Sequence, residues 1–336
     1  MLRTLRAAHE RWPLARPFRI SRGVKTAADV VAVEIAAGAA VGRGESVPYA
    51  RYGETVESVL AEVRSLEAEI AAGLDRQALL TRLPAGAARN ALDCALWDLE
   101  ARLGAGSVEA RTGISAAQGV VTALTVSLDT PEAMAAAARE LAGAPLVKVK
   151  VDADRPAEKI RAVAENASGA RLIVDPNEGW SFDLLQALQP LLAELKVALV
   201  EQPLPAAEDA VLEGFRPSVP ICADESAHTA ADLEGLRSRY QAVNIKLDKT
   251  GGLTEALEML RAARAMDFLV MTGCMVSTSL GVAPALPLAA RSDFADLDGP
   301  VWMAEDRPGG VRVEAGRLLP PAPGFWGDPE PHNGGL

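Results

Sequence analysis

The sequence contains little of what several protein classes require. Among 336 residues there are only three cysteines and three histidines, and 4% of the residues are aromatic. Cys94, Cys222 and Cys274 are odd in number and lack the close spacing of metal-binding motifs, so they indicate neither a disulfide framework nor a zinc site. We expect them to be reduced thiols in a cytoplasmic protein.

The sequence also shows no apolar stretch typical of a membrane-spanning helix or a signal peptide. No stretch approaches the ~20 consecutive apolar residues that a membrane helix needs, and residues 1–14 have charges and a proline instead of an apolar signal core. The formal net charge of −11 would repel a phosphate backbone, and no basic cluster has interleaved aromatic residues. We therefore expect a cytoplasmic protein with neither a membrane nor a nucleic-acid partner.

Eight short apolar runs, starting near residue 120, predict the strands of a parallel sheet. They alternate with longer segments rich in Ala, Leu, Glu and Arg, which is typical of βαβ units. The expected strands are residues 120–128, 146–151, 172–175, 198–202, 219–223, 242–247, 268–272 and 294–297. Eight parallel strands close a barrel, which commonly takes roughly 200 to 250 residues, so the rest of the chain is left for a smaller domain.

Amphipathic segments between these runs predict outer helices. Apolar residues recur at three- and four-residue spacing in 131–141, 156–166, 182–195 and 253–266. A Pro- and Gly-rich tail follows the eighth run where another helix would be expected. The prediction is an α/β fold: a modified TIM barrel of the (β/α)7β type over residues 116–304, followed by a tail, 305–336, that packs back on the N-terminal domain.

Residues 1–115 have a different pattern, which predicts an α+β capping domain. A β-type run at 30–35 precedes a loop at 49–53 and helices at about 56–72 and 87–102. The Gly- and Tyr-containing loop could close over the mouth of the barrel, but surface turns without a function have the same composition.

Charged residues end five successive apolar runs. Lys150, Asp175, Glu201, Asp224 and Lys246 follow one another at intervals of 22 to 26 residues. Catalytic groups of such barrels lie at the carboxyl ends of the strands, so we expect all five on one rim. Three converging carboxylates repel one another unless a cation lies among them, and oxygen ligands favour Mg²⁺. The three acids therefore predict one Mg²⁺ per subunit, although each acid alone could simply cap a helix.

The lysines predict acid–base chemistry. Lys148 and Lys150 share one side of their strand because side chains alternate, and Lys246 lies four strands away, across the barrel. Neighbouring ammonium groups, a divalent metal and desolvation are expected to lower lysine pKa values and provide neutral bases. Two bases on opposite faces of one carbon epimerise it, whereas Lys148 is better explained as neutralising the metal carboxylates.

Short motifs around these charged residues carry a family resemblance. They are Lys148-Val-Lys150, Asp175-Pro-Asn177, Glu201-Gln-Pro203, Ala223-Asp224-Glu225-Ser226, and residues 243–252, 84–98, 48–54, 273–275 and 295–300. Together they resemble the muconate-cycloisomerase branch of the enolase superfamily, and within it the dipeptide epimerases. The resemblance covers nearly the whole chain up to about residue 305.

The resemblance implies a role for each charged residue. Lys150 and Lys246 become the acid/base pair, and the three acids become ligands of Mg²⁺. Asp296 and Asp298 on the eighth strand would hold the α-ammonium group of a dipeptide, although alone they could be structural strand-end acids.

The resemblance also implies residues for the rest of the substrate. A cation in an N-terminal lid loop would bind the side-chain carboxylate, and Arg22 and Lys25 are both candidates. An Arg aligns near Lys25 in relatives, so the sequence departs from the family pattern there. The other expected substrate contacts are Lys148, Thr125, Cys274 and Met275, with Asn177 and Glu225 as supporting residues.

The expected function is Mg²⁺-dependent epimerisation of L-Ala-D-Glu and L-Ala-L-Glu, in which a metal stabilises the enolate formed by proton abstraction. Such dipeptides belong to cell wall peptide metabolism. The alternatives are another dipeptide, a β-elimination or cycloisomerisation as in o-succinylbenzoate synthase or muconate cycloisomerase, and a non-catalytic binding protein. The Asp296 and Asp298 pair disfavours elimination, whose substrates lack an ammonium group. A small dipeptide is the expected partner, and homo-oligomerisation is left open.

Overall fold

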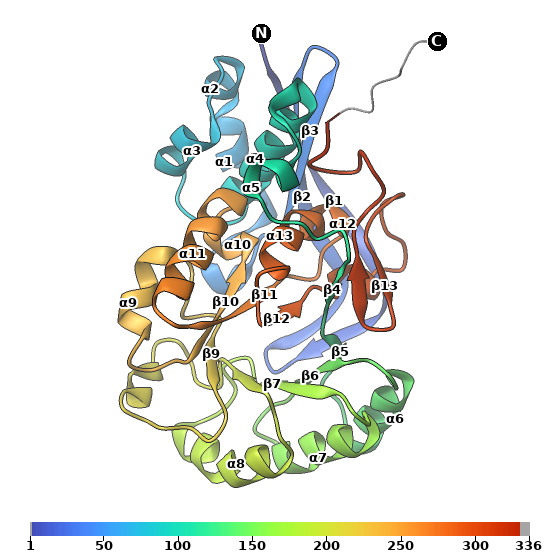
Figure 1. Cartoon of the computed structure of the whole chain (residues 1–336), viewed down its shortest axis with the longest axis vertical. Coiled ribbons are helices and arrows are strands. Elements are labelled where there is room, and N and C mark those ends of the chain that lie inside the picture. The colour runs from blue at the N-terminus through green and yellow to red at the C-terminus, as the bar shows by residue number, and fades with distance from the viewer. Residues whose placement is uncertain (1, 330–336) are drawn as a thin grey trace.

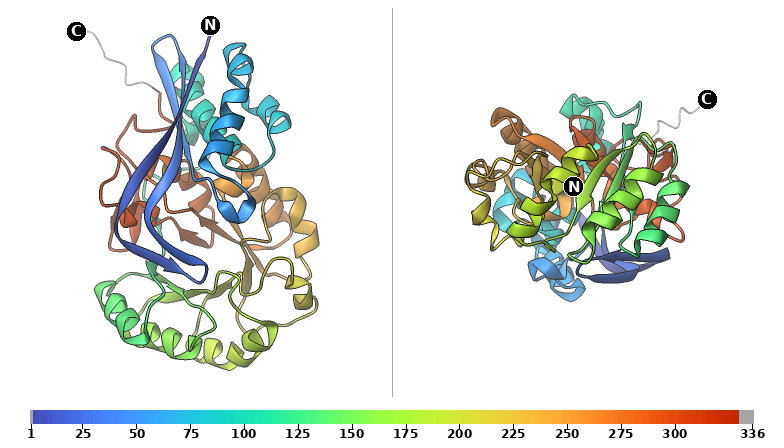
Figure 2. Two further views of the ribbon diagram at one scale, coloured as in Figure 1. Left: turned by 180° about the vertical axis from the view of Figure 1, so that it is seen from behind. Right: turned by 90° about the horizontal axis from the view of Figure 1, so that it is seen from below.

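The computed structural model describes residues 2–329, which form a capping domain and a barrel (Figure 1). The capping sheet is antiparallel, in the order β1 (Thr4–Ile20), β2 (Gly23–Ala37) and β3 (Ala40–Ser46). β1 and β2 form a long hairpin that runs from this domain along the barrel (Figure 2). The sequence predicts only 30–35 as a strand because β1 contains Pro13 and Pro17, many charged residues and no buried face.

Helices cover the capping sheet and confirm the expected helical regions. They are η1 (Ala50–Tyr52), α1 (Val56–Ser65), α2 (Glu67–Ala71), α3 (Arg76–Arg82), α4 (Ala87–Glu100), η2 (Ala101–Ala105) and α5 (Val108–Thr112). α3 was not predicted. α4 packs directly on β3, where a Cβ on Gly42 would lie 2.2 Å from the Ala95 carbonyl oxygen. Only glycine allows this close approach of helix and strand.

Eight parallel strands form the barrel in the order of the sequence, which confirms the predicted fold class. They are β5 (Leu124–Val126), β6 (Leu146–Lys150), β7 (Arg171–Asp175), β8 (Leu199–Glu201), β9 (Ile221–Ala223), β10 (Ala242–Lys246), β11 (Leu269–Gly273) and β12 (Phe294–Asp296). The Ala123 amide donates to the Ala295 carbonyl at 2.8 Å and links the last strand to the first. The carboxyl ends of these strands therefore surround one central opening.

The prediction of one barrel strand over 120–128 is wrong in its first part. β4 (Val120–Val121) pairs with β14 (Arg317–Leu319), which pairs with β13 (Arg312–Glu314) in a separate small sheet. The barrel strand begins only at β5. Val121 is 38% exposed, and its pairing partner lies almost two hundred residues later in the chain, which the local pattern of apolar residues does not indicate.

The outer helices follow the prediction where the amphipathic pattern is long. These are α6 (Pro131–Glu140), α7 (Pro156–Asn166), α8 (Phe182–Glu194) and α11 (Leu253–Ala265). Shorter elements fill the other connections: η3 (Asp209–Leu212), η4 (Ala230–Asp232), α9 (Leu233–Leu236), α10 (Leu247–Thr250), α12 (Ser279–Val282), η5 (Ala283–Ala285) and α13 (Leu286–Ala289). Through residue 329, β12 is followed by the single turn η6 (Gly299–Trp302) instead of an eighth α-helix, as the sequence predicts.

Buried contacts hold the capping domain on the barrel. The Glu45 carboxylate accepts a hydrogen bond from the Thr278 amide at 2.9 Å, and Asn90 donates to Asp248 at 2.8 Å. Near the end of the chain, the Trp326 indole donates to the Arg43 carbonyl at 3.0 Å. The predicted tail extends to residue 336, and residues 330–336 lie outside the described residues. The predicted boundaries at residues 115 and 304 stay predictions.

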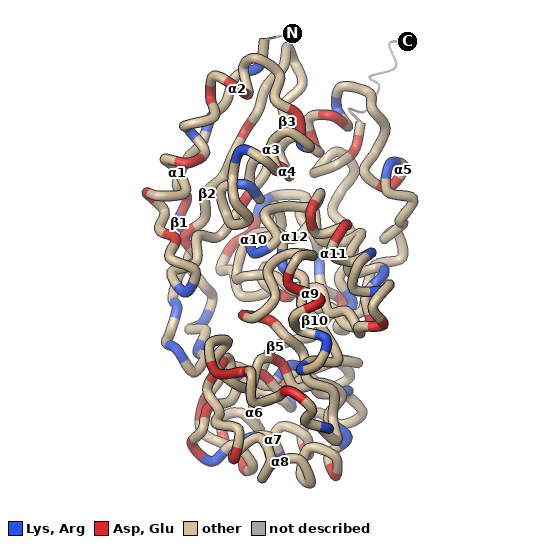
Figure 3. The backbone as a smooth tube through the Cα atoms, turned by 90° about the vertical axis from the view of Figure 1, so that its left-hand side faces the viewer, with Lys and Arg blue, Asp and Glu red and all other residues tan. Residues whose placement is uncertain are grey.

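Acidic and basic residues are interleaved over both domains (Figure 3). Among residues 2–329, no helix combines the length and the apolar character needed to cross a bilayer.

Candidate active site

The strand-end residues that the sequence singles out meet on one rim of the barrel. Lys150 ends β6, Asp175 ends β7, Glu201 ends β8, Asp224 follows β9 and Lys246 ends β10. At most 7% of each residue is exposed to solvent. Burial of this many charged groups requires that each be paired, and the pairs that form define the electrostatics of the site.

Lys148 is the hub of the acidic cluster. Its ammonium nitrogen lies 3.0 Å from Asp175, 2.5 Å from Glu201 and 2.7 Å from Asp296. Burial lowers the pKa of Lys148, but the charges of Asp175 and Asp296 outweigh it, and the pKa lies well above its ordinary value. These contacts fit the interpretation that Lys148 neutralises the acids, since it remains protonated.

The two lysines expected to transfer protons approach the acids from opposite sides. Lys150 lies 2.5 Å from Asp175 and 3.1 Å from the side-chain oxygen of Asn177. Lys246 lies 2.7 Å from Asp224 and comes from β10, four strands away from β6. Burial lowers the pKa of Lys246, yet Asp224 and Glu201 raise it well above its ordinary value. For Lys246 the protein groups alone thus act opposite to the lowered pKa that the sequence suggests.

The three acids fit a cation in their chemistry. Burial and the Asp175 charge raise the pKa of Glu201 to about 8. Burial also acts to raise the pKa of Asp224, but Lys246 and Lys249 hold it well below its usual range. Among the described residues, no three Asp, Glu, His or Cys side chains are arranged as metal ligands. Lysine ammonium groups lie between the acids instead, as Lys148 does 2.5 Å from Glu201. Converging carboxylate oxygens that already surround positive charge are the donor set that Mg²⁺ prefers.

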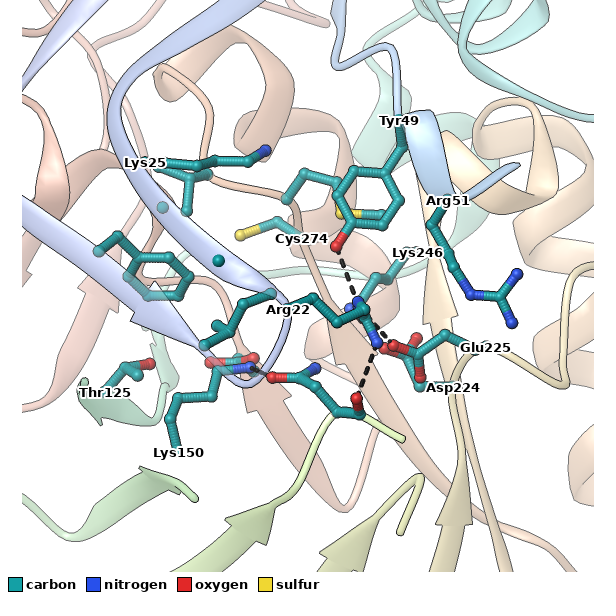
Figure 4. Close-up of a pocket in the computed structure, with 18 of the residues that line it drawn as sticks. Arg22, Lys25, Tyr49, Arg51, Thr125, Lys150, Asp224, Glu225, Lys246 and Cys274 are labelled. Atoms are coloured by element: carbon teal, nitrogen blue, oxygen red, sulfur yellow. Dashed lines mark hydrogen bonds and ion pairs between the residues drawn. The ribbon is translucent and has the colours of Figure 1, made fainter. Parts of the chain in front are cut away.

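A cavity of about 580 Å³ opens over this rim, between the barrel and two loops of the capping domain, around Arg22 and Tyr49 (Figure 4). Thirteen of the fifteen predicted site residues line it: Arg22, Lys25, Thr125, Lys148, Lys150, Asn177, Asp224, Glu225, Lys246, Cys274, Met275, Asp296 and Asp298. The other two, Asp175 and Glu201, are completely buried and lie in contact with Lys148. The volume suits a ligand of dipeptide size.

Sequence families match both parts of the chain. The family described as "Mandelate racemase / muconate lactonizing enzyme, N-terminal domain" matches residues 2–110, and "Enolase C-terminal domain-like" matches residues 132–325. The chain belongs to the enolase superfamily. This confirms the family that the sequence motifs indicate.

Individual relatives of this superfamily member are similar over almost their whole length. The L-Ala-D/L-Glu epimerase of Escherichia coli (strain K12) is 49% identical over 94% of this chain and 99% of that protein. The N-acetyl-D-glutamate racemase of a Pseudoalteromonas species is 43% identical over 85% of this chain and 91% of that protein. The expected epimerase reaction agrees with the activities for which these relatives are named.

Solved structures of the superfamily give the same result. An Agrobacterium tumefaciens enolase family member with homology to dipeptide epimerases, with bound sodium and L-Ala-L-Glu, has a TM-score of 0.94 and 50% identity, covering 97% of this chain and 100% of that one. The Enterococcus faecalis dipeptide epimerase with Mg and L-Leu-L-Tyr has a TM-score of 0.88 and 28% identity, covering 96% and 99%.

Arg22 and Lys25, the two candidates for binding a substrate carboxylate, differ in their surroundings. Arg22 is engaged by acids, 2.7 Å from Glu225 and 3.1 Å from Glu178. Lys25 lies over the Tyr49 ring, 5.2 Å from its centroid, and lines the cavity. Figure 4 shows Arg22 pointing toward Glu225, with Lys25 on the other side of Tyr49. Both side chains line the cavity, and they differ in that Arg22 is paired with acids.

The acids of the eighth strand lie together at the far side of the cavity. Asp298 accepts hydrogen bonds from the Thr125 amide at 2.8 Å and the Trp302 indole at 3.3 Å. Burial and the charge of Asp296 raise the pKa of Asp298 to about 6. Lys148 contacts only Oδ2 of Asp296, and among residues 2–329 the buried Oδ1 has no hydrogen-bond partner. A buried carboxylate oxygen of this kind requires a hydrogen-bond donor, from water or from a ligand.

The structure adds residues that the sequence interpretation missed. Lys249 is fully buried and contacts Asp224 Oδ1 at 2.6 Å, while Asn244 donates to Glu201 at 2.8 Å. Glu178 forms an ion pair with Arg51, which lines the cavity. A signal existed for Asn244, which lies two residues before Lys246 and thus on the same side of the strand. Glu178 gave none, because its role depends on loops from the other domain.

Proposed function

We propose that the protein is a Mg²⁺-dependent dipeptide epimerase that interconverts L-Ala-D-Glu and L-Ala-L-Glu. The observation that carries the proposal is the placement of Lys150 and Lys246 at the ends of opposite barrel strands, with both side chains lining one cavity. A relative named for this activity, 49% identical to this chain, supports the proposal. We also infer that it acts in the cytoplasm on cell wall peptides, and its three free thiols support the compartment.

The reaction is a proton exchange at one carbon. One lysine, as a neutral amine, takes the α-proton of the glutamyl residue from one face, and the other lysine, as an ammonium group, returns a proton to the opposite face. The glutamyl α-carbon is thereby inverted, and no atom is gained or lost. In the reverse direction the two lysines exchange roles.

Asp175, Glu201 and Asp224 are the residues that would hold Mg²⁺. When bound, the ion supplies positive charge beside the substrate carboxylate, where negative charge develops as the α-proton leaves. The lysines would then pair less closely with these acids, which favours their neutral forms. Lys148 and Lys249 hold the acids in place.

The two ends of the dipeptide find opposite charges. Oδ1 of Asp296 is available for the α-ammonium group, and Lys25 is available for the side-chain carboxylate of the glutamyl residue. An N-acylated glutamate, the kind of substrate for which the Pseudoalteromonas relative is named, has no ammonium group to fill the place beside Asp296. The acids of the eighth strand therefore favour the dipeptide over N-acyl glutamate and over elimination substrates.

The direct test follows the α-proton in D₂O with Mg²⁺ by NMR, using L-Ala-L-Glu and L-Ala-D-Glu. We expect deuterium at the glutamyl α-carbon together with interconversion of the two diastereomers. Lys150→Ala and Lys246→Ala should each abolish interconversion, and Glu208→Gln, a change at an exposed acid, is the matched control. The absence of exchange with any acidic dipeptide would refute the proposal.

A further inference from the structure

Two loops of the capping domain reach across the cavity and share a contact with Glu178 of the barrel, and Arg22 also contacts Glu225. Arg22 lies in the turn between β1 and β2, and Arg51 lies in η1. Arg51 contacts both carboxylate oxygens of Glu178, at 2.7 and 2.8 Å, and Arg22 contacts one of them at 3.1 Å. The Glu178 side chain is only 8% exposed, whereas that of Arg51 is 39% exposed. Both loops are therefore fastened at one acid, and we call Arg22, Arg51 and Glu178 the latch.

The backbone around Glu178 is held in an unusual conformation. Asn177 has φ 48° and Glu178 has φ 66°. Asparagine tolerates this left-handed region, whereas it is unfavourable for glutamate and tends to occur at functional sites. The Glu178 amide donates to the Gln202 carbonyl at 2.9 Å, and its carboxylate also accepts from the Ala206 amide at 2.8 Å. These contacts fix the turn to the loop that follows β8.

The residue before Glu178 connects this turn to the site of proton transfer. The Asn177 side-chain oxygen accepts a hydrogen bond from Lys150 at 3.1 Å, and the Asn177 backbone amide donates to the Asp175 carboxylate at 2.8 Å. Its carbonyl oxygen accepts from Ser21 at 3.0 Å and from Arg22 at 2.9 Å. One residue thus contacts the lid through its backbone and the proposed base through its side chain.

We propose that Glu178 is a positioning residue that couples closure of the two capping loops to the placement of Lys150. When Arg22 and Arg51 engage Glu178, the turn at residues 177–178 is fixed, and Asn177 holds the Lys150 ammonium group at its working position. Among residues 2–329, the ion pairs of Lys246 are with Asp224 and Glu201, and neither Asn177 nor Glu178 contacts its ammonium group. Loss of the latch therefore affects the Lys150 face more than the Lys246 face. This inference rests on the proposed two-lysine epimerase.

A first experiment measures the latch without any substrate. Arg22 and Arg51 are trypsin sites within the two loops, and cleavage there requires the loops to open locally. Glu178→Gln removes the charge that both arginines contact. We expect mass spectrometry of the native digest to show cleavage after Arg51 becoming at least about tenfold faster. The increase after Arg22 should be smaller, because Arg22 keeps its contact with Glu225. Glu208→Gln, which removes an equal charge at an exposed site nearby, should leave the rate unchanged. Equal rates for both variants would overturn the latch.

A second experiment separates the two faces of the substrate. In a Lys246→Ala background only Lys150 exchanges the α-proton, and in a Lys150→Ala background only Lys246 does. We expect Glu178→Gln to slow exchange in the first background at least about fivefold more than in the second, since it disturbs hydrogen bonding at Lys150 only. Equal slowing in both backgrounds would overturn the coupling. Failure of the unmodified protein to exchange any dipeptide would instead reject the proposed function, and the trypsin result would still decide the latch.

Discussion

Replacing Asp296 by Asn should weaken dipeptide turnover because of where its two oxygens lie. Oδ2 contacts Lys148 at 2.7 Å, and Oδ1 is buried without a hydrogen-bond partner among the described residues. In the variant, the amide oxygen keeps the contact with Lys148 only if the NH₂ group takes the place of Oδ1. A donor then faces the substrate ammonium group. The opposite orientation would place the NH₂ group against Lys148, so neither orientation restores the site.

The expected size follows from the bond that is lost. A hydrogen bond to a charged group contributes about 1.5 to 3 kcal/mol, which corresponds to about a 10- to 150-fold loss in kcat/KM for L-Ala-L-Glu. The assay is α-proton exchange in D₂O, with N-propionyl-L-glutamate as the second substrate because it matches the dipeptide but lacks the ammonium group. Asp296→Asn should affect this analogue much less than the dipeptide. Equal losses on both substrates would refute the assignment of Asp296 to the ammonium group.

Four further predictions concern the other groups of the site and the domain interface. Lys150→Ala and Lys246→Ala should each keep α-proton exchange with one diastereomer of the dipeptide and lose it with the other, as NMR in D₂O will record. Lys25→Met should raise KM for L-Ala-L-Glu by about 10- to 100-fold through loss of a charged contact and leave L-Ala-L-Leu unaffected, and steady-state kinetics on both will test this. Removal of divalent ions with EDTA should abolish exchange, and added Mg²⁺ should restore it; exchange that survives dialysis against EDTA would contradict the assignment of the acids. Burial raises the pKa of Asp248 from 3.8 to about 7. Between these pH values the folded protein keeps a proton on Asp248 that the unfolded chain has lost, so the free energy of unfolding falls by on the order of 4 kcal/mol as pH rises from about 4 to about 7. Asp248→Asn should therefore raise the melting temperature at pH 8 and not at pH 4, and equal shifts at both would argue against ionisation of this group.

The charged residues at the strand ends could be predicted from the sequence, because each follows an apolar run and these runs recur at intervals of 22 to 26 residues. Lys150, Asp175, Glu201, Asp224 and Lys246 each close an apolar run, and the geometry of a parallel barrel brings such positions to one rim. The same reasoning required no knowledge of the connecting loops. It therefore gave the fold class and the proposed proton-transfer residues together.

Contacts between distant segments could not be predicted in this way. β4 pairs with β14, and Glu178 receives arginines from two capping loops, so each depends on residues more than a hundred positions away. The long strand β1 was missed because it buries no continuous face. The close ion pair of Lys246 with Asp224, at 2.7 Å, could not be predicted either, because the sequence does not give distances between side chains of different strands.

The buried contacts between the domains limit how the enzyme admits its substrate. Glu45 with Thr278 and Asn90 with Asp248 hold the capping domain on the barrel, and the contact of Trp326 with Arg43 holds the C-terminal segment on the capping domain. Rotation of one domain against the other would break the contacts between them, so a substrate can enter only when the short loops over the cavity open. Opening of a lid takes microseconds to seconds, so the contacts of the loops with Glu178, and not the domain interface, govern entry and exit.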